Sequence, residues 1–371
     1  GYVCASSSLE EEAADVESMP MSLAISGGAS LGAYEAGLNW AIIKYIKKER
    51  ERALYERQSA PDLVSIAGAS AGGINTLLSA ISWCMDDKKV ENHSNSNVGD
   101  SVSNNLFYYY WSKVSLDRFL PENGQYGDDD GVFSRAEFNK ITDVIVGVLA
   151  EEIYRDGCQI PFALTATRTE PLAVTIEGVE DIKVKNARFI IPLLLKSNNQ
   201  QKGKVDLHNY IIGELGQKDP FLGNIIYLPH NSSTKNGKNV LDTDVVKRAV
   251  EATSAFPVAF GRVNLPYCLK NADSKGKQNS DSCPSGYSKQ QDHFVDGGVF
   301  DNMPLGTAKA LAELADSTPV RKSKPYNYIY LSPGNRRLYA DVTPKSRQQP
   351  KYRSFGITQQ LSFLQGAVLT A

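Results

Sequence analysis

The chain is 371 residues long, 42% of them hydrophobic and 22% charged, so it can bury a large core as one big α/β domain or two smaller ones. Its 40 basic and 42 acidic residues nearly cancel, and the net charge of -2 provides no long-range field that would attract nucleic acid or an anionic membrane. We therefore expect no nucleic-acid partner, and any contact with a membrane surface should be peripheral, local and largely apolar.

The N-terminal residues 1–18 are small, acidic and polar, and they lack the basic and then apolar pattern of a signal peptide. We expect residues 1–20 to form a flexible leader and residues 21–371 to form one domain. The cysteines include no C-x-x-C pair and no histidine at metal spacing, so we expect no metal site. A disulfide between Cys268 and Cys283 would close a polar loop and favour export; the location is otherwise open between a soluble protein and one at a membrane surface.

Short runs of β-branched or apolar residues predict strands at 22–25, 63–67, 161–166, 172–176, 189–195, 225–228, 293–295 and 326–331. Helical periodicity marks residues 33–52, 73–85, 134–153, 245–252 and 305–315. This alternation predicts an α/β fold with a mostly parallel sheet that is covered on both faces. Polar stretches near 87–105, 124–130 and 269–292 are typical of surface insertions.

A glycine-rich loop, S-G-G-A-S-L-G over residues 26–32, follows the first predicted strand. Gly27, Gly28 and Ala29 would expose consecutive backbone N–H groups, which can bind a phosphate or hold the oxyanion of a tetrahedral intermediate. The loop matches neither G-x-G-x-x-G nor G-x-x-x-x-G-K-[ST], which disfavours dinucleotide and P-loop binding. A merely tight turn is the remaining alternative.

Residues 68–72, G-A-S-A-G, follow the second predicted strand and precede a helix, which is the context of a nucleophile elbow. Such a turn strains the backbone of Ser70 and leaves room only for small neighbours such as Gly68 and Gly72. Ser70 would lie at a helix N-terminus, where the helix dipole favours developing negative charge. A turn that only packs a helix closely on a strand would show the same pattern.

The D-G-G sequence of residues 296–298 ends another short predicted strand. Because the carboxyl ends of parallel strands gather at one edge of a sheet, we expect Asp296 to meet Ser70 beside the glycine loop. Asn302 or Asp301 would cap the helix that follows. An isolated D-G pair is more commonly a turn acid that bonds its own backbone.

In this order, the sequences at 27–32, 68–72 and 296–298 resemble the three motifs of the patatin-like phospholipase family. Residues 249–260, A-V-E-A-T-S-A-F-P-V-A-F, also resemble the family's A-x-x-A-(S/T)-x-A-x-P-x-x-F stretch. The resemblance implies a three-layer α/β/α fold with a mostly parallel central sheet, a catalytic domain without cofactor or catalytic metal, and a phospholipid or other acyl lipid as substrate.

The resemblance further implies a phospholipase A or lysophospholipase type of reaction, in which a Ser-Asp dyad forms an acyl-enzyme intermediate. By position, Ser70 matches the nucleophile and Asp296 matches its base. The matching oxyanion and supporting residues are Gly27, Gly28, Ala29, Gly68, Gly72, Gly297, Gly298 and Asn302.

Two positions depart from the family pattern. Ala29 replaces a glycine, which leaves the backbone N–H in place, and Leu31 replaces a basic residue. If a cation is needed near the loop, Arg262 or Arg336 would have to supply it.

Three other interpretations stay open. A Ser-His-Asp esterase would need a histidine, for which His293 is the plausible candidate. A catalytically inert effector module could use the same loop to recognise lipid. Residues 128–137 partly fit a calcium loop, although Ser134 and Glu137 also form a capping box, so we favour a plain capped helix.

Overall fold

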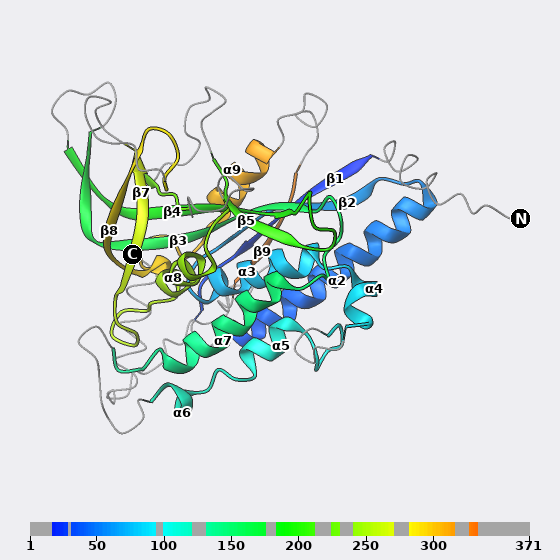
Figure 1. The fold of residues 1–371 in the computed structure, drawn as a ribbon, viewed down its shortest axis with the longest axis horizontal. Coiled ribbons are helices and arrows are strands. Elements are labelled where there is room, and N and C mark those ends of the chain that lie inside the picture. Colours follow the sequence, from blue (N-terminus) through cyan, green and yellow to red (C-terminus); the bar gives the residue numbers. More distant parts are fainter. Residues whose placement is uncertain are drawn as a thin grey trace, which may run out of the picture.

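The computed structural model describes residues 17–28, 31–93, 99–120, 131–175, 183–211, 224–230, 240–270, 282–315 and 326–332. A single mixed sheet with the strand order β5-β4-β3-β2-β1-β9 forms its centre (Figure 1). The strands are β1 (Ser18–Ile25), β2 (Ala60–Gly68), β3 (Gln159–Thr175), β4 (Lys183–Ser197), β5 (Val205–Asn209), β6 (Asn224–Ile225), β7 (Val263–Lys270), β8 (Tyr287–Asp296) and β9 (Asn327–Leu331).

The strands at the centre of the sheet run parallel: β9 pairs with β1, β1 with β2, and β2 with β3. Antiparallel strands extend the sheet beyond β3, which pairs with both β4 and β8. Leu23, Ile25 and Ile66 in the parallel part are fully buried. Apolar residues therefore follow one another in these strands, because protein covers both faces of a parallel sheet.

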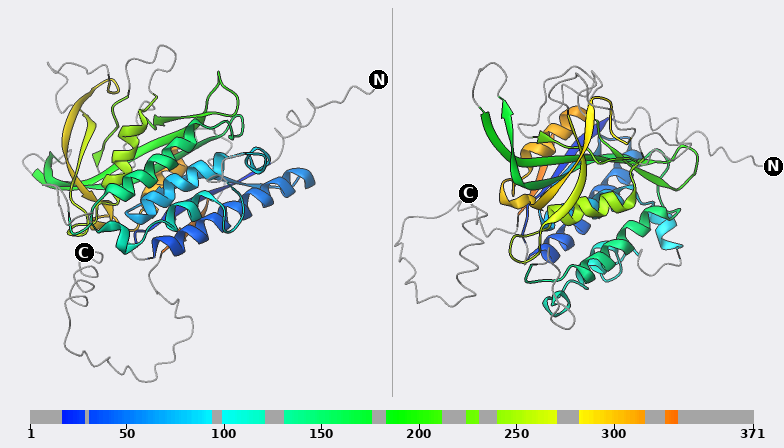
Figure 2. Two further views of the ribbon diagram at one scale, coloured as in Figure 1. Left: turned by 60° about the horizontal axis from the view of Figure 1, so that its bottom comes forward. Right: turned by 60° about the vertical axis from the view of Figure 1, so that its left-hand side comes forward.

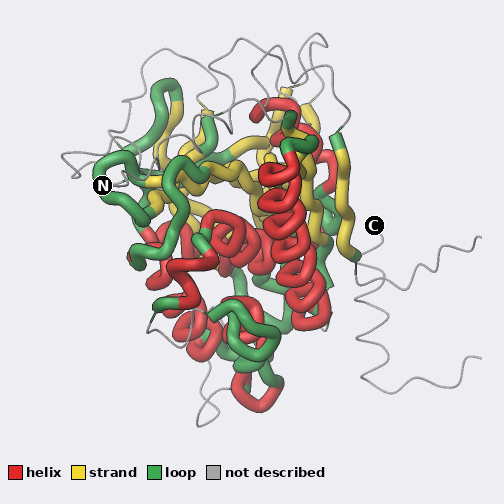
Figure 3. The backbone as a smooth tube through the Cα atoms, turned by 90° about the vertical axis from the view of Figure 1, so that its right-hand side faces the viewer, coloured by secondary structure: helices red, strands yellow, loops and turns green. Residues whose placement is uncertain are grey.

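The helices form two layers around this sheet. They are α2 (Gly32–Glu56), α3 (Ala71–Cys84), α4 (Asp87–Glu91), α5 (Leu106–Trp111), α6 (Leu116–Phe119), α7 (Ala136–Gly147), α8 (Thr243–Thr253) and α9 (Leu305–Ala315). Helices α2, α3, α5, α7 and α8 cover one face and α9 covers the other (Figures 1 and 2). Figure 3 shows most of the helices gathered on one side of the strand layer. The predicted three-layer α/β/α fold is thus confirmed.

Two strands and three short helices were not anticipated from the sequence. The two strands are β5 and β7. Strand β5 alternates buried and partly exposed side chains, and β7 forms a hairpin with β8 that carries many solvent-facing polar residues. Neither β5 nor β7 therefore has a continuous apolar run. Two of the predicted surface insertions therefore contain regular structure: β7 and β8 extend into the range 269–292, and α4 lies within 87–105. The stretch 124–130 lies outside the described residues.

Two disulfides join separate parts of the fold. Cys268 pairs with Cys283 across the β7–β8 hairpin, as the spacing suggested. Cys84 at the end of α3 pairs with Cys158, one residue before β3, and no sequence signal indicated this second bridge.

Candidate active site

The register of the central strands brings the predicted motifs together. Ile25 at the end of β1 pairs with Gly68 at the end of β2, and Gly68 pairs with Leu164 on β3. Two residues further along β3, Ala166 pairs with Asp296. Strand β8 runs antiparallel to β3. Asp296 therefore ends an antiparallel strand, whereas the sequence predicted that it would end a parallel one.

Ser70 lies in a sharp turn between β2 and α3. Its backbone has φ 57° and ψ -130°, a conformation that costs a non-glycine residue on the order of 1–3 kcal/mol. Ser70 occupies the N-cap position of α3 without using its side chain as a cap, so the hydroxyl remains available for another partner.

The glycines on either side of Ser70 are required by close packing. A Cβ at Gly68 would overlap the Gly72 carbonyl and the Thr76 hydroxyl. A Cβ at Gly72 would overlap the carbonyls of Ile25 and Ser26 at the end of β1. Backbone atoms cannot yield as a flexible side chain can, so this turn accepts only glycine at both positions.

Asp296 is the hydrogen-bond acceptor for Ser70. The Ser70 Oγ donates to Asp296 Oδ2 at 2.5 Å, and the Gly298 N–H donates to Asp296 Oδ1 at 2.6 Å. The exposed fractions of Ser70 and Asp296 are 6% and 1%. Gly297 lies so close to Thr165 that a side chain would overlap its carbonyl and hydroxyl. Packing and backbone hydrogen bonds thus fix the carboxylate against the hydroxyl.

Burial changes the acidity of this carboxyl group. Desolvation raises the pKa of Asp296 to about 7, although the hydrogen bonds from Ser70 and Gly298 pull it down. A carboxylate with a pKa near neutrality is a much better proton acceptor than an ordinary aspartate, and it is still ionised in a large fraction of molecules at pH 7.

Asn302 connects the glycine loop to the aspartate turn. The Gly27 N–H donates to the Asn302 carbonyl at 3.3 Å, and the Asn302 Nδ2 donates to the Gly27 carbonyl at 3.3 Å. The Gly27 N–H is therefore occupied, whereas among the described residues no backbone oxygen accepts from the Gly28 N–H. Ala29 lies outside the described residues.

A further amide was missed in the sequence. Ala71 is the first residue of α3, and the N–H groups of a first helical turn have no acceptor within the helix. Its position directly after the strained serine was the available signal, since nucleophile elbows use that N–H in the oxyanion hole. The dipole of α3 adds partial positive charge at the same point.

A small apolar cavity of about 70 Å³ opens beside Ser70. It is lined by Ser70, Ala71, Ile74, Tyr110, Trp111, Val114, Phe119, Phe138, Ser254, Phe256 and Phe260. Residues 249–260 and α5 supply part of this wall, together with α6 and α7. Because no lining side chain carries a charge, the described cavity suits a hydrocarbon chain.

The histidine alternative finds no support in the geometry. Side chains alternate along β8, so His293 faces the side opposite to Phe294 and Asp296. His93 pairs with Glu151 at 3.3 Å, and His208 lies in β5. Within the described residues, Asp296 is the acceptor that the Ser70 hydroxyl contacts.

The residues that carry the calcium-loop hypothesis fall largely where the structure does not describe the chain. Asp128, Asp129 and Asp130 lie outside the described residues, and no group of three or more potential metal ligands occurs in the described part. Helix α7 begins at Ala136, whose N–H donates to the Ser134 hydroxyl at 3.2 Å. Ser134 therefore bonds the start of α7 as a capping residue would, although the N-cap position itself is held by Arg135.

The basic residues proposed near the loop remain without an assigned role. The Arg262 carbonyl accepts from Arg135 at 3.4 Å, and Arg336 lies outside the described residues.

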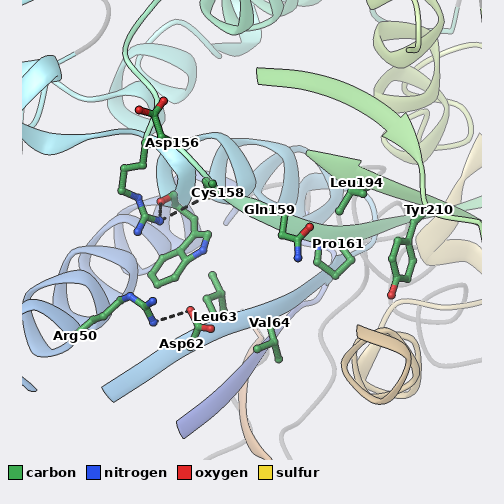
Figure 4. Close-up of a pocket in the computed structure, with 13 residues that line it drawn as sticks. Arg50, Asp62, Leu63, Val64, Asp156, Cys158, Gln159, Pro161, Leu194 and Tyr210 are labelled. Carbon is green, nitrogen blue, oxygen red and sulfur yellow. Dashed lines mark hydrogen bonds and ion pairs between the residues drawn. The ribbon is translucent and has the colours of Figure 1, made fainter. Parts of the chain in front are cut away.

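A larger cavity of about 380 Å³ lies at the amino ends of β2 and β3 (Figure 4), whereas Ser70 follows the carboxyl end of β2. Arg50 donates to Asp62 at 2.8 Å along one side of this cavity, and Asp156 points away from it. Arg155 donates to the Trp83 carbonyl and lies over the Trp83 ring at 4.9 Å. Arg50 and Arg155 are therefore each held by contacts within the protein.

A family model described as Patatin-like phospholipase matches residues 23–309, which is most of the chain. This match confirms the resemblance that the motifs indicated. No curated protein matches the chain at a significant level. Within the described residues, none of the helices is both long and apolar enough to cross a membrane.

Proposed function

Because the chain belongs to the patatin-like phospholipases, a family of lipid acyl hydrolases, we propose that it cleaves acyl esters of phospholipids through Ser70 and Asp296. The observation that carries this proposal is the 2.5 Å hydrogen bond from the Ser70 hydroxyl to the buried Asp296 carboxylate. A hydroxyl in contact with a base, at the end of a helix and beside an apolar cavity, is the arrangement that nucleophilic acyl transfer needs.

In the first half of the reaction, Asp296 accepts the Ser70 proton while Oγ attacks the ester carbonyl. The carbonyl oxygen becomes an oxyanion, which the N–H groups of Gly28 and Ala71 and the dipole of α3 would stabilise. Collapse of the tetrahedral intermediate breaks the ester C–O bond. Protonated Asp296 returns its proton to the departing alcohol, which leaves an acyl group on Ser70.

In the second half, Asp296 takes a proton from water as the water oxygen attacks the acyl-enzyme. A second tetrahedral intermediate forms in the same site and collapses to release the fatty acid. The proton then returns to the Ser70 oxygen. Every step uses the same two side chains, so no cofactor enters the proposed mechanism.

The cavity beside Ser70 supports the proposed substrate class. Its described walls are apolar and aromatic, so an acyl chain would be favoured there over a polar group. A phospholipase A or lysophospholipase type of activity fits this arrangement. The enzyme would work at a peripheral membrane surface, where such lipids are found.

The disulfides bear on where the reaction would take place. Cys84–Cys158 and Cys268–Cys283 would form and persist in an oxidising compartment. We therefore favour an exported enzyme.

The test compares fatty-acid release from a mixed phospholipid panel by the wild type and by Ser70→Ala, with and without a chelator. We expect release by the wild type in both buffers and loss in the variant. Equal release by Ser70→Ala would contradict the proposed nucleophile. Absence of release from every lipid and short ester would favour an inert lipid-binding module instead.

A further inference from the structure

A second apolar groove of about 350 Å³ lies between α2 and α5, next to the catalytic cavity. Helix α2 lines one side of it with four small residues and one large one: Ala33, Ala36, Gly37, Ala41 and Trp40. The opposite side is aromatic and consists of Phe107, Tyr108 and Trp111 from α5. Small side chains facing large flat ones leave a channel that the two helices do not fill.

The lining of this groove suits hydrocarbon. None of its described lining side chains carries a charge, and its volume falls in the range of small-molecule pockets, roughly 300–1,000 Å³. Tyr108 and Val102 at its edge are 51% and 73% exposed. The groove is therefore apolar inside and open to the surroundings at its rim.

Trp111 forms a common wall between the groove and the cavity at Ser70, because it lines both. Its indole N–H donates to the buried Asn75 Oδ1 at 2.7 Å, and the Asn75 Nδ2 donates to the Gly32 carbonyl at 3.2 Å. The ring lies so close to Gly32 that even a Cβ there would overlap it. Trp111 is thus fixed as a partition, and the two spaces are separate.

The groove also lies close to the reacting centre along the chain. Helix α2 begins at Gly32, four residues after Gly28, so Ala33 brings the groove wall to the end of the glycine loop. A lipid whose ester lies at Ser70 could therefore place one chain on each side of Trp111.

We propose that this groove binds the second acyl chain of a diacyl phospholipid while the chain to be cleaved occupies the cavity at Ser70. This inference rests on the proposed function and adds a substrate class to it. The uncleaved chain gains apolar contacts that a monoacyl lipid cannot make. Diacyl lipids are then the preferred substrates over their lyso forms.

The test fills the groove by Gly37→Phe. A Cβ at Gly37 meets no atom within 4 Å, so the side chain starts without a clash, and Gly37 itself lines the groove. Gly147→Phe is the matched control, because Gly147 is also an exposed helical glycine with no atom within 4 Å but lies on α7 outside the groove. Thermal melting of both variants checks that each is folded.

The probes are monomeric diheptanoyl phosphatidylcholine, monoheptanoyl lysophosphatidylcholine and p-nitrophenyl butyrate. We expect Gly37→Phe to lower kcat/KM for the diacyl lipid by about tenfold or more, because the loss of a few buried methylene groups has that effect. The other two substrates should change less than about twofold, and Gly147→Phe should match the wild type on all three.

An unchanged diacyl preference in Gly37→Phe, or a wild type that prefers the lyso lipid, would overturn the groove assignment while leaving the proposed function intact. An equal fall on all three substrates would also overturn it, since the groove would then support the fold or hold another segment. If the wild type hydrolysed none of the three, the proposed function itself would fail.

Discussion

The Ser70 hydroxyl donates to the Asp296 carboxylate at 2.5 Å, although the two residues are 226 positions apart in the chain. One strained turn and one antiparallel strand end create this contact. The pairing makes the protonation state of Asp296 the main control over the chemistry that we propose.

The first prediction concerns the pH dependence of hydrolysis. Burial raises the pKa of Asp296 to about 7, and only the ionised carboxylate can accept the Ser70 proton. We expect kcat/KM for a neutral, soluble ester to rise with pH and to level off above the pKa, with an apparent pKa within about one unit of 7. A profile that is flat from pH 5 to 9 would contradict Asp296 as the base.

A second prediction links the same group to stability. The folded protein keeps a proton on Asp296 that the unfolded chain, with the ordinary value near 3.8, releases. The stabilisation is therefore complete below about pH 4 and is lost as the pH rises through about 7. Asp296→Asn should remove this loss, so at pH 8 it should be more stable than the wild type by at most about 4 kcal/mol.

Urea unfolding at pH 4.5 and pH 8 measures this difference. Ser70→Ala keeps the carboxyl group but removes a hydrogen bond that lowers its pKa, so it should keep the pH dependence or enlarge it, which makes it the matched control. Glu35 is also buried, and burial raises its pKa to about 8. Glu35→Gln should therefore remove a separate part of the stability loss at high pH. If the stability gap between Asp296→Asn and the wild type is the same at both pH values, the buried-acid account is wrong.

A third prediction tests the packing of the nucleophile turn. Gly72→Ala would drive a methyl group into the backbone carbonyls of Ile25 and Ser26, which should cost about 1–3 kcal/mol and abolish most activity. Gly306→Ala on α9 meets no atom within 4 Å and should stabilise the protein by about 0.5–1 kcal/mol. Thermal melts and ester hydrolysis of both variants compare the two effects. Normal activity in Gly72→Ala would show that the turn is looser than described.

The fourth prediction concerns the two disulfides, which use four of the five cysteines. Thiol labelling of the oxidised, denatured protein should modify one cysteine, and labelling after reduction should modify five. The Cys84–Cys158 bridge spans 74 positions and the Cys268–Cys283 bridge spans 15, so removing the first should destabilise the fold by about 1 kcal/mol more. Labelling of five thiols without reductant would exclude both bridges.

The sequence predicted the α/β fold from its alternation of strands and helices, and the ordered glycine motifs predicted the contact between Ser70 and Asp296. It did not reveal the antiparallel direction of β8, since a hairpin with polar outer faces lacks a continuous apolar signal. The cavity wall was also hidden, because Tyr110, Phe138 and Phe260 come from separate segments and resemble ordinary core residues.

The glycine loop shows a second limit of sequence reasoning. Gly27 was expected to offer its N–H to an oxyanion, but that group donates to the Asn302 carbonyl. The choice between the two acceptors depends on how the aspartate turn packs on the loop, which no local pattern specifies. Asn302 was expected as a supporting residue of the site, and its contacts with Gly27 join the aspartate turn to the glycine loop.

The most direct test of the central claim is the rate at which a fluorophosphonate modifies the protein, with the modified residue identified by peptide mass spectrometry. We predict an adduct on Ser70, a rate reduced roughly 10²–10⁴-fold by Asp296→Asn, and a rate unchanged by His293→Ala. An adduct on another residue, a normal rate in Asp296→Asn, or loss of labelling in His293→Ala would contradict the Ser70–Asp296 dyad.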